Sequence, residues 1–260
     1  MSEASGEFAI RLENVHKSFH RGHEPVLNGV SIDFPVGKLT YILGSSGAGK
    51  SVMLKHILGL VKPDKGRVWV AGKELSRLSS TALAQHRLVF GMLFQNSALF
   101  DDMTVFENVA FPLREHTNKT DAEIAEAVKK ALTILGMPSG YDKMPNELSG
   151  GMRKRVGLAR AIIREPSILL YDEPTTGLDP VTRTTVDDLI ATLKQELKLT
   201  SVVISHDIPS ALLLADRIAF LDKGRIVFWG TPQEFRVAQH EAIQAFLNAE
   251  QRTLKVLLQS

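Results

Sequence analysis

The sequence contains no cysteine, which excludes disulfide bonds and thiolate metal sites. It also has no long hydrophobic run. The longest apolar stretches, such as Ile168 to Tyr171 and Val202 to Ile204, have the length of a strand, whereas a membrane-spanning helix needs about 20 apolar residues. We therefore expect that this polypeptide does not cross a membrane itself, and that any membrane role comes through a partner.

An excess of charge of one sign is also missing. The chain carries 31 basic and 29 acidic residues, a net charge of +2, whereas nucleic-acid-binding proteins normally show a strong basic excess. We therefore expect no nucleic-acid partner. Residues 1–13 are acidic and hold no apolar segment, so we expect no secretory signal. With 260 residues, 44% of them hydrophobic, the chain can bury a core, and its length favours one domain with an inserted or appended subdomain.

The first third of the chain shows a change of pattern. Residues 8–35 alternate apolar and polar positions around a predicted turn at Arg21 to Pro25, which indicates antiparallel strands with one solvated face. Lys38 to Leu43 is typical of a buried strand and leads directly into a glycine-rich loop. Lys50 to Leu60 then favours a helix.

The middle of the chain, residues 96–150, is predicted to be a helical insertion. Thr120 and Glu123 form a capping box, and the apolar positions after it share one helical face: Ile124, Val128, Ala131, Leu132 and Leu135. From Ser167 an α/β pattern follows. It comprises a strand at Ile168 to Tyr171, a helix and a strand at Ser201 to Ser205. The helix is marked by Val186, Leu189, Ile190, Leu193 and Leu197. Buried strands that alternate with helices predict a parallel sheet covered on both faces.

The C-terminal part is predicted to hold a hairpin and helices. Arg217 to Leu221 and Arg225 to Trp229 flank a turn, and Thr231 opens a helix with proline at its first position. Beyond His240 the tail favours a helix that docks on another surface, because it carries many apolar residues. These are Ile243, Phe246, Leu247, Leu254, Leu257 and Leu258.

One motif points directly to phosphate chemistry. Gly44, Ser45, Ser46, Gly47, Ala48, Gly49, Lys50 and Ser51 match the P-loop pattern GxxxxGK[ST]. The glycines allow the backbone N–H groups to surround phosphates, Lys50 reaches the β- and γ-phosphates, and the Ser51 hydroxyl is a ligand of Mg²⁺. An ordinary glycine-serine turn is the alternative, but the predicted strand before the loop and the predicted helix after it favour nucleotide binding.

Two further motifs fit the same chemistry. Asp172 and Glu173 end an apolar strand, where Asp172 would hold Mg²⁺ through water and Glu173 would act as general base. Ser149, Gly150 and Gly151 precede a basic helix and form a second candidate anion site. Alone, each has an ordinary explanation: a solvated turn for the acids and a plain helix cap for Ser149. Two phosphate sites in one chain suggest that two copies share a nucleotide.

In their order along the chain, these motifs resemble those of the ABC ATPases. Leu148 to Gly151 resembles the family's signature motif. Phe19 resembles the aromatic residue that stacks on adenine in this family, and Gln95 resembles the glutamine of its Q-loop. Asp179 lies in a segment similar to the D-loop, and His206 resembles the switch histidine. Alone, Phe19 would more often be core, Gln95 a polar loop residue and His206 a hydrogen-bonded histidine. The resemblance covers about residues 8–235.

The resemblance implies an α/β fold with a RecA-like P-loop NTPase core, an N-terminal antiparallel β subdomain and a helical signature subdomain. We expect an ABC ATPase domain over residues 1–235, with the helical subdomain at about 96–165, and a C-terminal helical extension over 236–260. The resemblance also implies ATP and Mg²⁺ as cofactors, the latter held by Ser51, Gln95 and Asp172. Lys50, Gln95, Glu173 and His206 would act in hydrolysis within a head-to-tail homodimer.

Residues 91–116 more narrowly resemble the ATPase subunit of bacterial lipid transporters of the Mla and MCE type, and Met152 fits that group. This implies phospholipid transport and a place on the cytoplasmic face of the inner membrane, as a peripheral subunit. It also implies three partners: an integral-membrane permease, a STAS-like regulatory subunit and an MCE-domain protein. An ABC transporter for another cargo, a soluble P-loop kinase and a DNA-repair or translation ABC protein are the alternatives. We expect Leu99 and Phe100 to line an exposed groove for a membrane-subunit helix, whereas Met103 and Val105 fit either that groove or the core.

Overall fold

The computed structural model describes residues 8–19 and 24–249. The chain forms two compact units, a first unit of Met1–Arg87 with Ile204–Ser260 and a second unit of Leu88–Val203. The expectations for residues 1–7, for most of the turn at 21–25 and for Leu254, Leu257 and Leu258 lie outside the described residues. No helix within the described residues is long and apolar enough to span a membrane.

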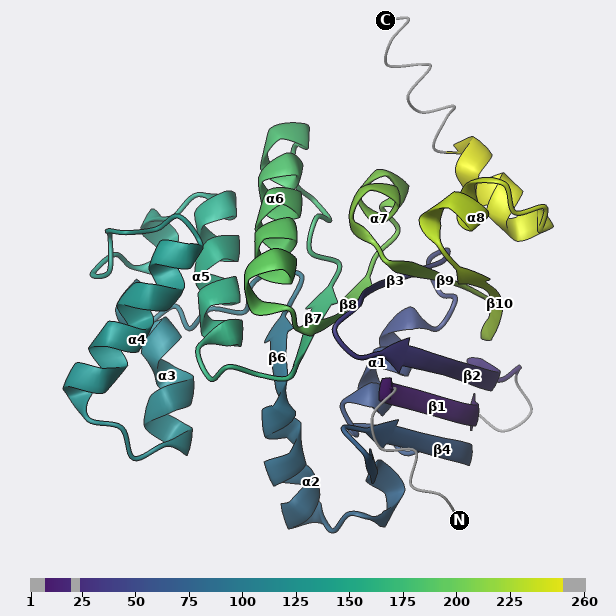
Figure 1. Ribbon diagram of the computed structural model, residues 1–260, viewed down its shortest axis with the longest axis horizontal. Coiled ribbons are helices and arrows are strands. Elements are labelled where there is room, and N and C mark those ends of the chain that lie inside the picture. Colours follow the sequence, from purple (N-terminus) through teal and green to yellow (C-terminus); the bar gives the residue numbers. More distant parts are fainter. Residues whose placement is uncertain (1–7, 20–23, 250–260) are drawn as a thin grey trace, which may run out of the picture. The chain divides into compact units, whose positions relative to one another are not determined.

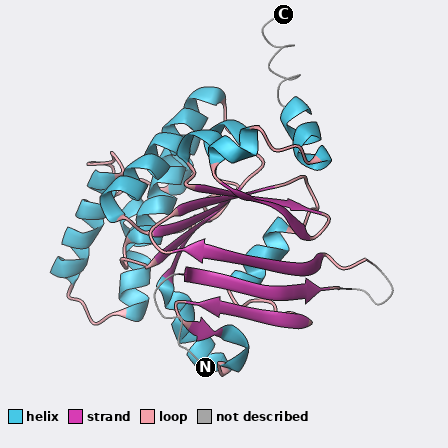
Figure 2. Ribbon diagram, turned by 45° about the vertical axis from the view of Figure 1, so that its right-hand side comes forward, coloured by secondary structure: helices cyan, strands magenta, loops and turns pink. Residues whose placement is uncertain are grey.

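The first unit contains an antiparallel sheet in the strand order β2-β1-β4-β5. Its strands are β1 (Phe8–Lys17), β2 (Leu27–Pro35), β4 (Lys65–Val70) and β5 (Lys73–Glu74). Ile10 pairs with Phe34 on one side and with Val70 on the other, and all three side chains are buried. The antiparallel strands predicted for residues 8–35 are therefore confirmed. In Figure 2 the strands appear as magenta arrows.

Three more strands of this unit hold the P-loop. These are β3 (Leu39–Leu43), β9 (Arg217–Asp222) and β10 (Arg225–Gly230). Strand β9 is parallel to β3 and antiparallel to β10. All five residues of β3 are buried, as expected for a strand covered on both faces. The hairpin turn has positive φ angles of 44° at Lys223 and 71° at Gly224, the geometry that fits the twist of such a hairpin.

The labelled α-helices of the first unit are α1 (Lys50–Ile57), α2 (Ser80–His86), α7 (Ile208–Leu214) and α8 (Pro232–Arg236). A short 3₁₀ turn at Leu75–Arg77 precedes α2. Helix α1 ends at Ile57, before the predicted end at Leu60. Gly59 there adopts a φ of 64°, and the N–H of Leu60 donates to the carbonyl of Lys55 at 2.8 Å. This bond closes the helix at its C-terminus.

The described part of the C-terminal tail is helical over residues 241–249. Ile243 is fully buried, and the ring of Phe246 lies 5.2 Å from that of Phe220 on β9. Phe235 of α8 contacts the same ring and that of Phe228. The predicted docking of the tail is therefore confirmed for these residues, and the surface that receives them belongs to the chain itself.

The second unit contains strands in the order β8-β7-β6, together with helices. The strands are β6 (Phe90–Leu93), β7 (Ile168–Asp172) and β8 (Thr200–Ile204). The last residue of β8 falls in the first unit. The helices are α3 (Val105–His116), α4 (Asp121–Ile134), α5 (Gly150–Ile162) and α6 (Pro180–Leu197). Short 3₁₀ turns lie at Arg87–Val89 and Pro145–Glu147.

Helices α3, α4 and α5 pack against one another (Figure 1), as expected for a helical insertion. All five apolar residues predicted to share one face of α4 and its end are buried. In α6 the predicted residues Val186, Leu189, Ile190 and Leu193 are buried, while Leu197 is half-buried. Strands β6 and β7 pair in parallel, with Phe90 opposite Ile168. The α/β pattern predicted for this part is therefore confirmed.

Candidate functional site

The loop between β3 and α1 depends on its glycines. Gly44, Gly47 and Gly49 have φ angles of 154°, 79° and 107°, a region that other residues rarely adopt. A Cβ atom on Gly44 would lie 2.3 Å from the carbonyl oxygen of Leu221, and one on Gly49 would lie 2.8 Å from that of Val26. The backbone can follow this path only with glycine at these two positions. Next to Gly47 there is open space, so this side of the loop is accessible.

Lys50 lies across the loop that precedes it. Its side chain is buried, with 8% exposed, and Nζ donates to the carbonyl oxygens of Gly44 at 2.6 Å and Ser45 at 3.0 Å. Ser51 follows in the first turn of α1 and is exposed. The ammonium group therefore lies beside the concave backbone of the loop, where a phosphate would be recognised.

The N-terminus of α1 differs from those of helices α2 to α8. Its cap is Gly49, which provides no side-chain hydrogen bond, and its first turn holds no acidic residue. Helices α2 to α8 are each capped by a Ser, Thr or Asp side chain. An N-terminus without such a cap, carrying the positive end of the helix dipole, is suited to bind an anion.

Phe19 lies just after β1 and is 54% exposed. The Lys17 ammonium is 5.6 Å from its ring centroid and also donates to Asp64 at 2.8 Å. The backbone N–H of Ser18 donates to the same carboxylate. The hydrogen bond from Lys17 is the main cause that lowers the pKa of Asp64. These contacts fix the backbone before Phe19 and leave much of its ring accessible for stacking.

His206 follows β8 and is exposed. Its neighbours are buried and anchored: the N–H of Asp207 donates to the Ser205 hydroxyl at 3.0 Å, and the Asp207 carboxylate caps α7 by accepting from the N–H of Ser210 at 3.1 Å. The backbone at His206 is therefore fixed between a strand end and a helix start.

The acidic pair lies where β7 ends. Tyr171 is buried, and burial raises the pKa of its hydroxyl. Asp172 and Glu173 are half-buried. Glu173 has a φ of 48°, and its carboxylate accepts a hydrogen bond from the Thr176 hydroxyl at 2.9 Å. A left-handed non-glycine residue costs about 1–3 kcal/mol and is enriched at functional sites. This conformation makes Glu173 a candidate catalytic group on structural grounds as well.

Gln95 follows β6 in an exposed loop. Its carbonyl oxygen accepts a hydrogen bond of 2.5 Å from Lys154 of α5. Farther along, the fully buried Asn108 holds the loop, because its amide nitrogen donates to the carbonyl oxygens of Phe100, Met103 and Thr104, each at 3.0 Å. Sequence reasoning assigned no role to Lys154 or Asn108, because hydrogen bonds from side chains to loop carbonyl groups leave no signal in the sequence.

The apolar residues after Gln95 divide into two groups. Val105 is fully buried and belongs to the core, as one of the two interpretations expects. Leu99 and Met103 are half-buried. Phe100 is 39% exposed, and its ring lies 4.9 Å from that of Phe111. The exposed groove for a membrane-subunit helix stays a prediction.

Ser149 caps helix α5. Its hydroxyl accepts from the N–H of Met152 at 3.3 Å, and the first turn of α5 holds no acidic residue. A Cβ atom on Gly150 would meet nothing within 4 Å, whereas one on Gly151 would lie 3.4 Å from the Thr182 methyl group. The signature segment therefore presents a helix N-terminus with open space beside Gly150, which is compatible with phosphate binding.

Asp179 is engaged locally. Its carboxylate accepts hydrogen bonds from the N–H groups of Val181 and Thr182, both at 3.0 Å, and from the Thr182 hydroxyl at 2.5 Å. The bonds from Thr182 are the largest causes that lower its pKa. Asp179 is thus the N-cap of α6, and its role toward a nucleotide stays a prediction.

The structure places the candidate residues in two groups. The first unit holds Phe19, the P-loop and His206, and the second unit holds Gln95, the segment Ser149 to Gly151, Asp172, Glu173 and Asp179. Within the described residues no group of three or more His, Cys, Asp or Glu side chains could hold a metal ion.

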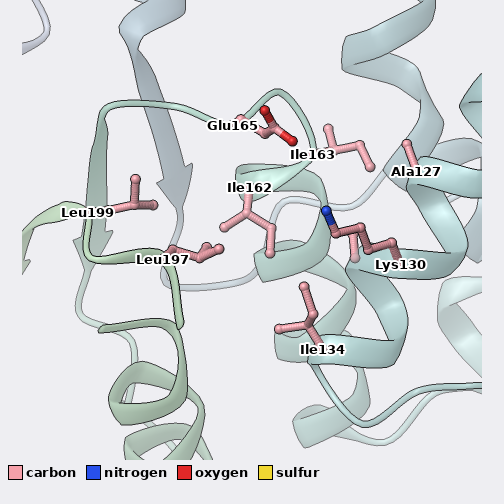
Figure 3. A pocket seen from close by; sticks show the side chains of 9 residues that line it. Ala127, Lys130, Ile134, Ile162, Ile163, Glu165, Leu197 and Leu199 are labelled. Carbon is pink, nitrogen blue, oxygen red and sulfur yellow. The ribbon is translucent and has the colours of Figure 1, made fainter. Parts of the chain in front are cut away.

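A cavity of about 240 Å³ in the second unit lies among α4, the end of α5 and the segment after α6 (Figure 3). Lys130 and Glu165 are the charged side chains of an otherwise apolar lining. No candidate site residue lines this cavity, so it is separate from the nucleotide motifs.

A P-loop whose lysine spans the loop, together with an acidic pair at a strand end, defines a nucleotide-binding ATPase of the P-loop class. Residues 27–176 match the family described as ABC transporter. The chain belongs to the ABC transporter family, in which it is an ATP-binding, ATP-hydrolysing cassette, and the resemblance inferred from its motifs is confirmed.

Two similar proteins have known names. The chain is 38% identical over 240 residues to the "probable ribonucleotide transport ATP-binding protein mkl" of Mycobacterium leprae, covering 92% of this chain and 69% of the relative. It is 40% identical over 231 residues to the "intermembrane phospholipid transport system ATP-binding protein MlaF" of Escherichia coli K12, covering 89% and 86%. The chain thus spans about two thirds of the mycobacterial relative's length and most of MlaF.

One solved structure that is similar to this chain is a dimer. It is described as the dimeric structure of a post-hydrolysis state of an ATP-binding cassette bound to ADP and Pi. It aligns with a TM-score of 0.75 and 31% identity, over 86% of this chain and 98% of the neighbour. The predicted α/β P-loop fold is therefore confirmed.

Proposed function

We propose that this chain powers phospholipid transport between bacterial membranes by hydrolysing ATP in a head-to-tail dimer. The observation that carries the proposal is the P-loop: its glycines, the lysine that lies across it and the helix N-terminus without a side-chain cap form one phosphate-binding surface. The similarity to MlaF supports phospholipid as the cargo.

Lys50 would bind the β- and γ-phosphates, with the backbone of residues 44–49 around them. The two carbonyl oxygens that now accept hydrogen bonds from Lys50 would be exchanged for phosphate oxygens. Phe19 would stack on the adenine ring, a role that its exposed position after β1 supports.

Mg²⁺ would be held by Ser51, Gln95 and Asp172. Their hydroxyl, amide and carboxylate oxygens are the hard donors that this ion prefers, and few protein ligands suffice because phosphates and water complete its shell. When bound, the ion neutralises charge on the phosphate oxygens. The exposed Ser51 and half-buried Asp172 are compatible with this role.

Glu173 would accept a proton from the water that attacks the γ-phosphate, and His206 and Gln95 would orient that water and the phosphate. The base needs a fixed position more than a large pKa shift, since phosphoryl transfer is catalysed chiefly by positioning and charge stabilisation. The left-handed backbone of Glu173 supports a fixed position.

Ser149, Gly150 and Gly151 would bind the γ-phosphate of the nucleotide held by the other subunit, with Asp179 near the same contact. The dimeric neighbour supports such an assembly. ATP then favours the closed dimer because only that state completes both sites. The dimer would sit on the cytoplasmic face of the inner membrane, on a permease, with a STAS-like subunit and an MCE-domain protein as further partners.

Replacing Lys50 tests the hydrolytic part. Lys50→Ala removes the cation from the phosphates, so ATP turnover should fall by about 100-fold or more. The matched control is Lys55→Ala, which removes an exposed lysine from the same helix. Steady-state phosphate release from the full chain is the measurement. Near-normal turnover by Lys50→Ala would contradict the proposed site.

The cargo needs a separate test, because the name of the mycobacterial relative contains ribonucleotide transport. The complex should be purified from solubilised membranes and its bound proteins and small molecules identified by mass spectrometry. We expect phospholipid together with a permease and an MCE-domain protein. Recovery of ribonucleotides as cargo, without phospholipid, would favour ribonucleotide transport as the function of this chain.

A further inference from the structure

Helix α5 begins at the signature segment and carries a stripe of four residues that face strand β6 and the Gln95 loop. The stripe consists of Lys154, Gly157, Arg160 and Ala161, which lie on one side of the helix because their spacing follows its turns. We call this set the loop-facing stripe. It contains both cations and small residues, and each kind makes a different contact.

The small residues allow the backbones to approach closely. A Cβ atom on Gly91 of β6 would lie 2.2 Å from the carbonyl oxygen of Ala161. A Cβ atom on Gly157 would lie 3.2 Å from the Cβ of Ser97 and 3.0 Å from a methyl group of Leu93. The end of β6 and the Gln95 loop therefore rest directly on α5, with no room for a larger side chain.

The cations of the stripe hold the loop by its carbonyl groups. Lys154 donates to the carbonyl oxygen of Gln95 at 2.5 Å, and the guanidinium of Arg160 donates to those of Ser97 and Ala98, both at 2.8 Å. Neither cation forms a salt bridge within the described part of the chain. Lys154 is only 4% exposed, and burial lowers its pKa to about 8. Burial of a lysine charge lowers the stability of the folded state. We therefore attribute the contact between Lys154 and the Gln95 carbonyl to function and not to stability.

The part of the loop bound by Arg160 has an unfavourable backbone. Ser97 and Ala98 are consecutive residues with positive φ angles of 59° and 46°, a conformation that is unfavourable for residues other than glycine. Such residues persist where their surroundings fix them. The three hydrogen bonds from α5 act on these residues and on Gln95, so the loop conformation depends on the stripe.

We propose that Lys154 and Arg160 are positioning residues for ATP hydrolysis: they fix the Gln95 loop on the signature helix, so that any displacement of the Ser149 end moves Gln95 with it. This inference rests on the proposed roles of Gln95 and Ser149. Through these contacts, the Ser149 segment, which would bind the nucleotide of the other subunit, is coupled to Gln95, which would orient the nucleotide of its own chain.

The test replaces Lys154 by Met, which preserves length but cannot donate. We expect kcat for ATP to fall by about 10- to 100-fold, because a displacement on the order of 1 Å has that effect on a positioned group. KM should change by no more than about twofold, since the P-loop lies in the other unit. The melting temperature should stay the same or rise, because a buried charge is replaced by an apolar side chain. Lys154→Arg keeps a charged donor and should restore most of the activity.

Two further measurements separate positioning from a structural role. Amide hydrogen exchange should accelerate at residues 94–98 in Lys154→Met and stay unchanged in α4. The matched control is Lys129→Met, an exposed lysine of α4, which should alter neither exchange nor kcat. If Lys154→Met does not fold, the shorter Lys154→Gln, which cannot reach Gln95, takes its place.

A kcat at the wild-type level in a folded Lys154 variant would overturn the inference. A loss of kcat that follows a fall in melting temperature, without rescue by Arg, would overturn it too. The proposed function fails separately: it is contradicted if Lys50→Ala retains turnover in the same assay, whatever Lys154 does.

Discussion

At the scale of single residues, several unusual backbone conformations of this chain lie in its nucleotide motifs or close to them in the sequence. Gly44 and Gly49 occupy backbone positions that any side chain would block, and Glu173, Ser97 and Ala98 adopt left-handed angles without being glycine. The glycine requirement follows from the P-loop pattern and could be predicted. The strain at Glu173 could not, because it depends on how the strand end is held in three dimensions.

Glu173→Gln should separate binding from cleavage. The amide has nearly the same shape but cannot accept the proton from water, so hydrolysis should fall by about 100-fold or more while ATP still binds. An ATP-dependent dimer should then persist in size-exclusion chromatography. Glu165→Gln is the matched control, because Glu165 is exposed, belongs to the same unit and also has a positive φ of 52°. A Glu173→Gln protein that stays monomeric with ATP, both alone and in the full complex, would argue against the shared site.

At the scale of elements, helix caps connect sequence to structure most directly. The capping boxes Thr104–Glu107, Thr120–Glu123 and Thr231–Glu234 are all formed. In each, hydrogen bonds from the threonine backbone N–H and hydroxyl lower the pKa of the glutamate below its usual value of 4.5. A carboxylate with a lowered pKa in the folded state stabilises the fold above its unfolded pKa. That contribution is lost as the pH falls through the folded pKa.

The stability of the fold should therefore decrease as the pH falls from about 5 through the acidic range. A triple variant with glutamine in place of Glu107, Glu123 and Glu234 keeps each capping box but removes its titration. Melting temperatures measured between pH 7 and pH 3.5 should fall less steeply for the variant than for the wild type. Equal slopes would show that these carboxylates do not contribute to the pH dependence.

Comparison of the helices and strands with the sequence patterns shows which features could be predicted and which could not. Strands, helices and caps follow from local patterns, and the signals at Thr120 and Thr231 correctly located α4 and α8. Contacts between distant segments carry no such signal: Asn108 holds a loop that ends before its helix begins, and Lys154 binds a carbonyl 59 positions away. The sequence placed Lys154 in a basic helix, but only the structure shows that Lys154 and Arg160 are the cations of that helix that bind the Gln95 loop.

At the scale of the whole molecule, the chain carries two surfaces suited to phosphate, the P-loop in one unit and the signature segment in the other. Each lies at a helix N-terminus that has no acidic residue in its first turn. A single copy of the chain has one P-loop and would not need a second phosphate-binding surface. In a head-to-tail pair, each of the two nucleotides would be bound by the P-loop of one copy and the signature segment of the other. The dimeric neighbour with ADP and Pi is consistent with this arrangement.

The most direct test is a mixed dimer with Lys50→Ala on one copy and Ser149→Arg on the other. If Ser149 acts on the nucleotide of its partner, both changes fall at one site and the opposite site keeps all its residues. We expect that intact site to trap nucleotide at about half the total level of the wild-type dimer, whereas homodimers of either variant trap little. Equal damage at both sites of the mixed dimer would mean that Ser149 acts within its own chain, and would contradict the account.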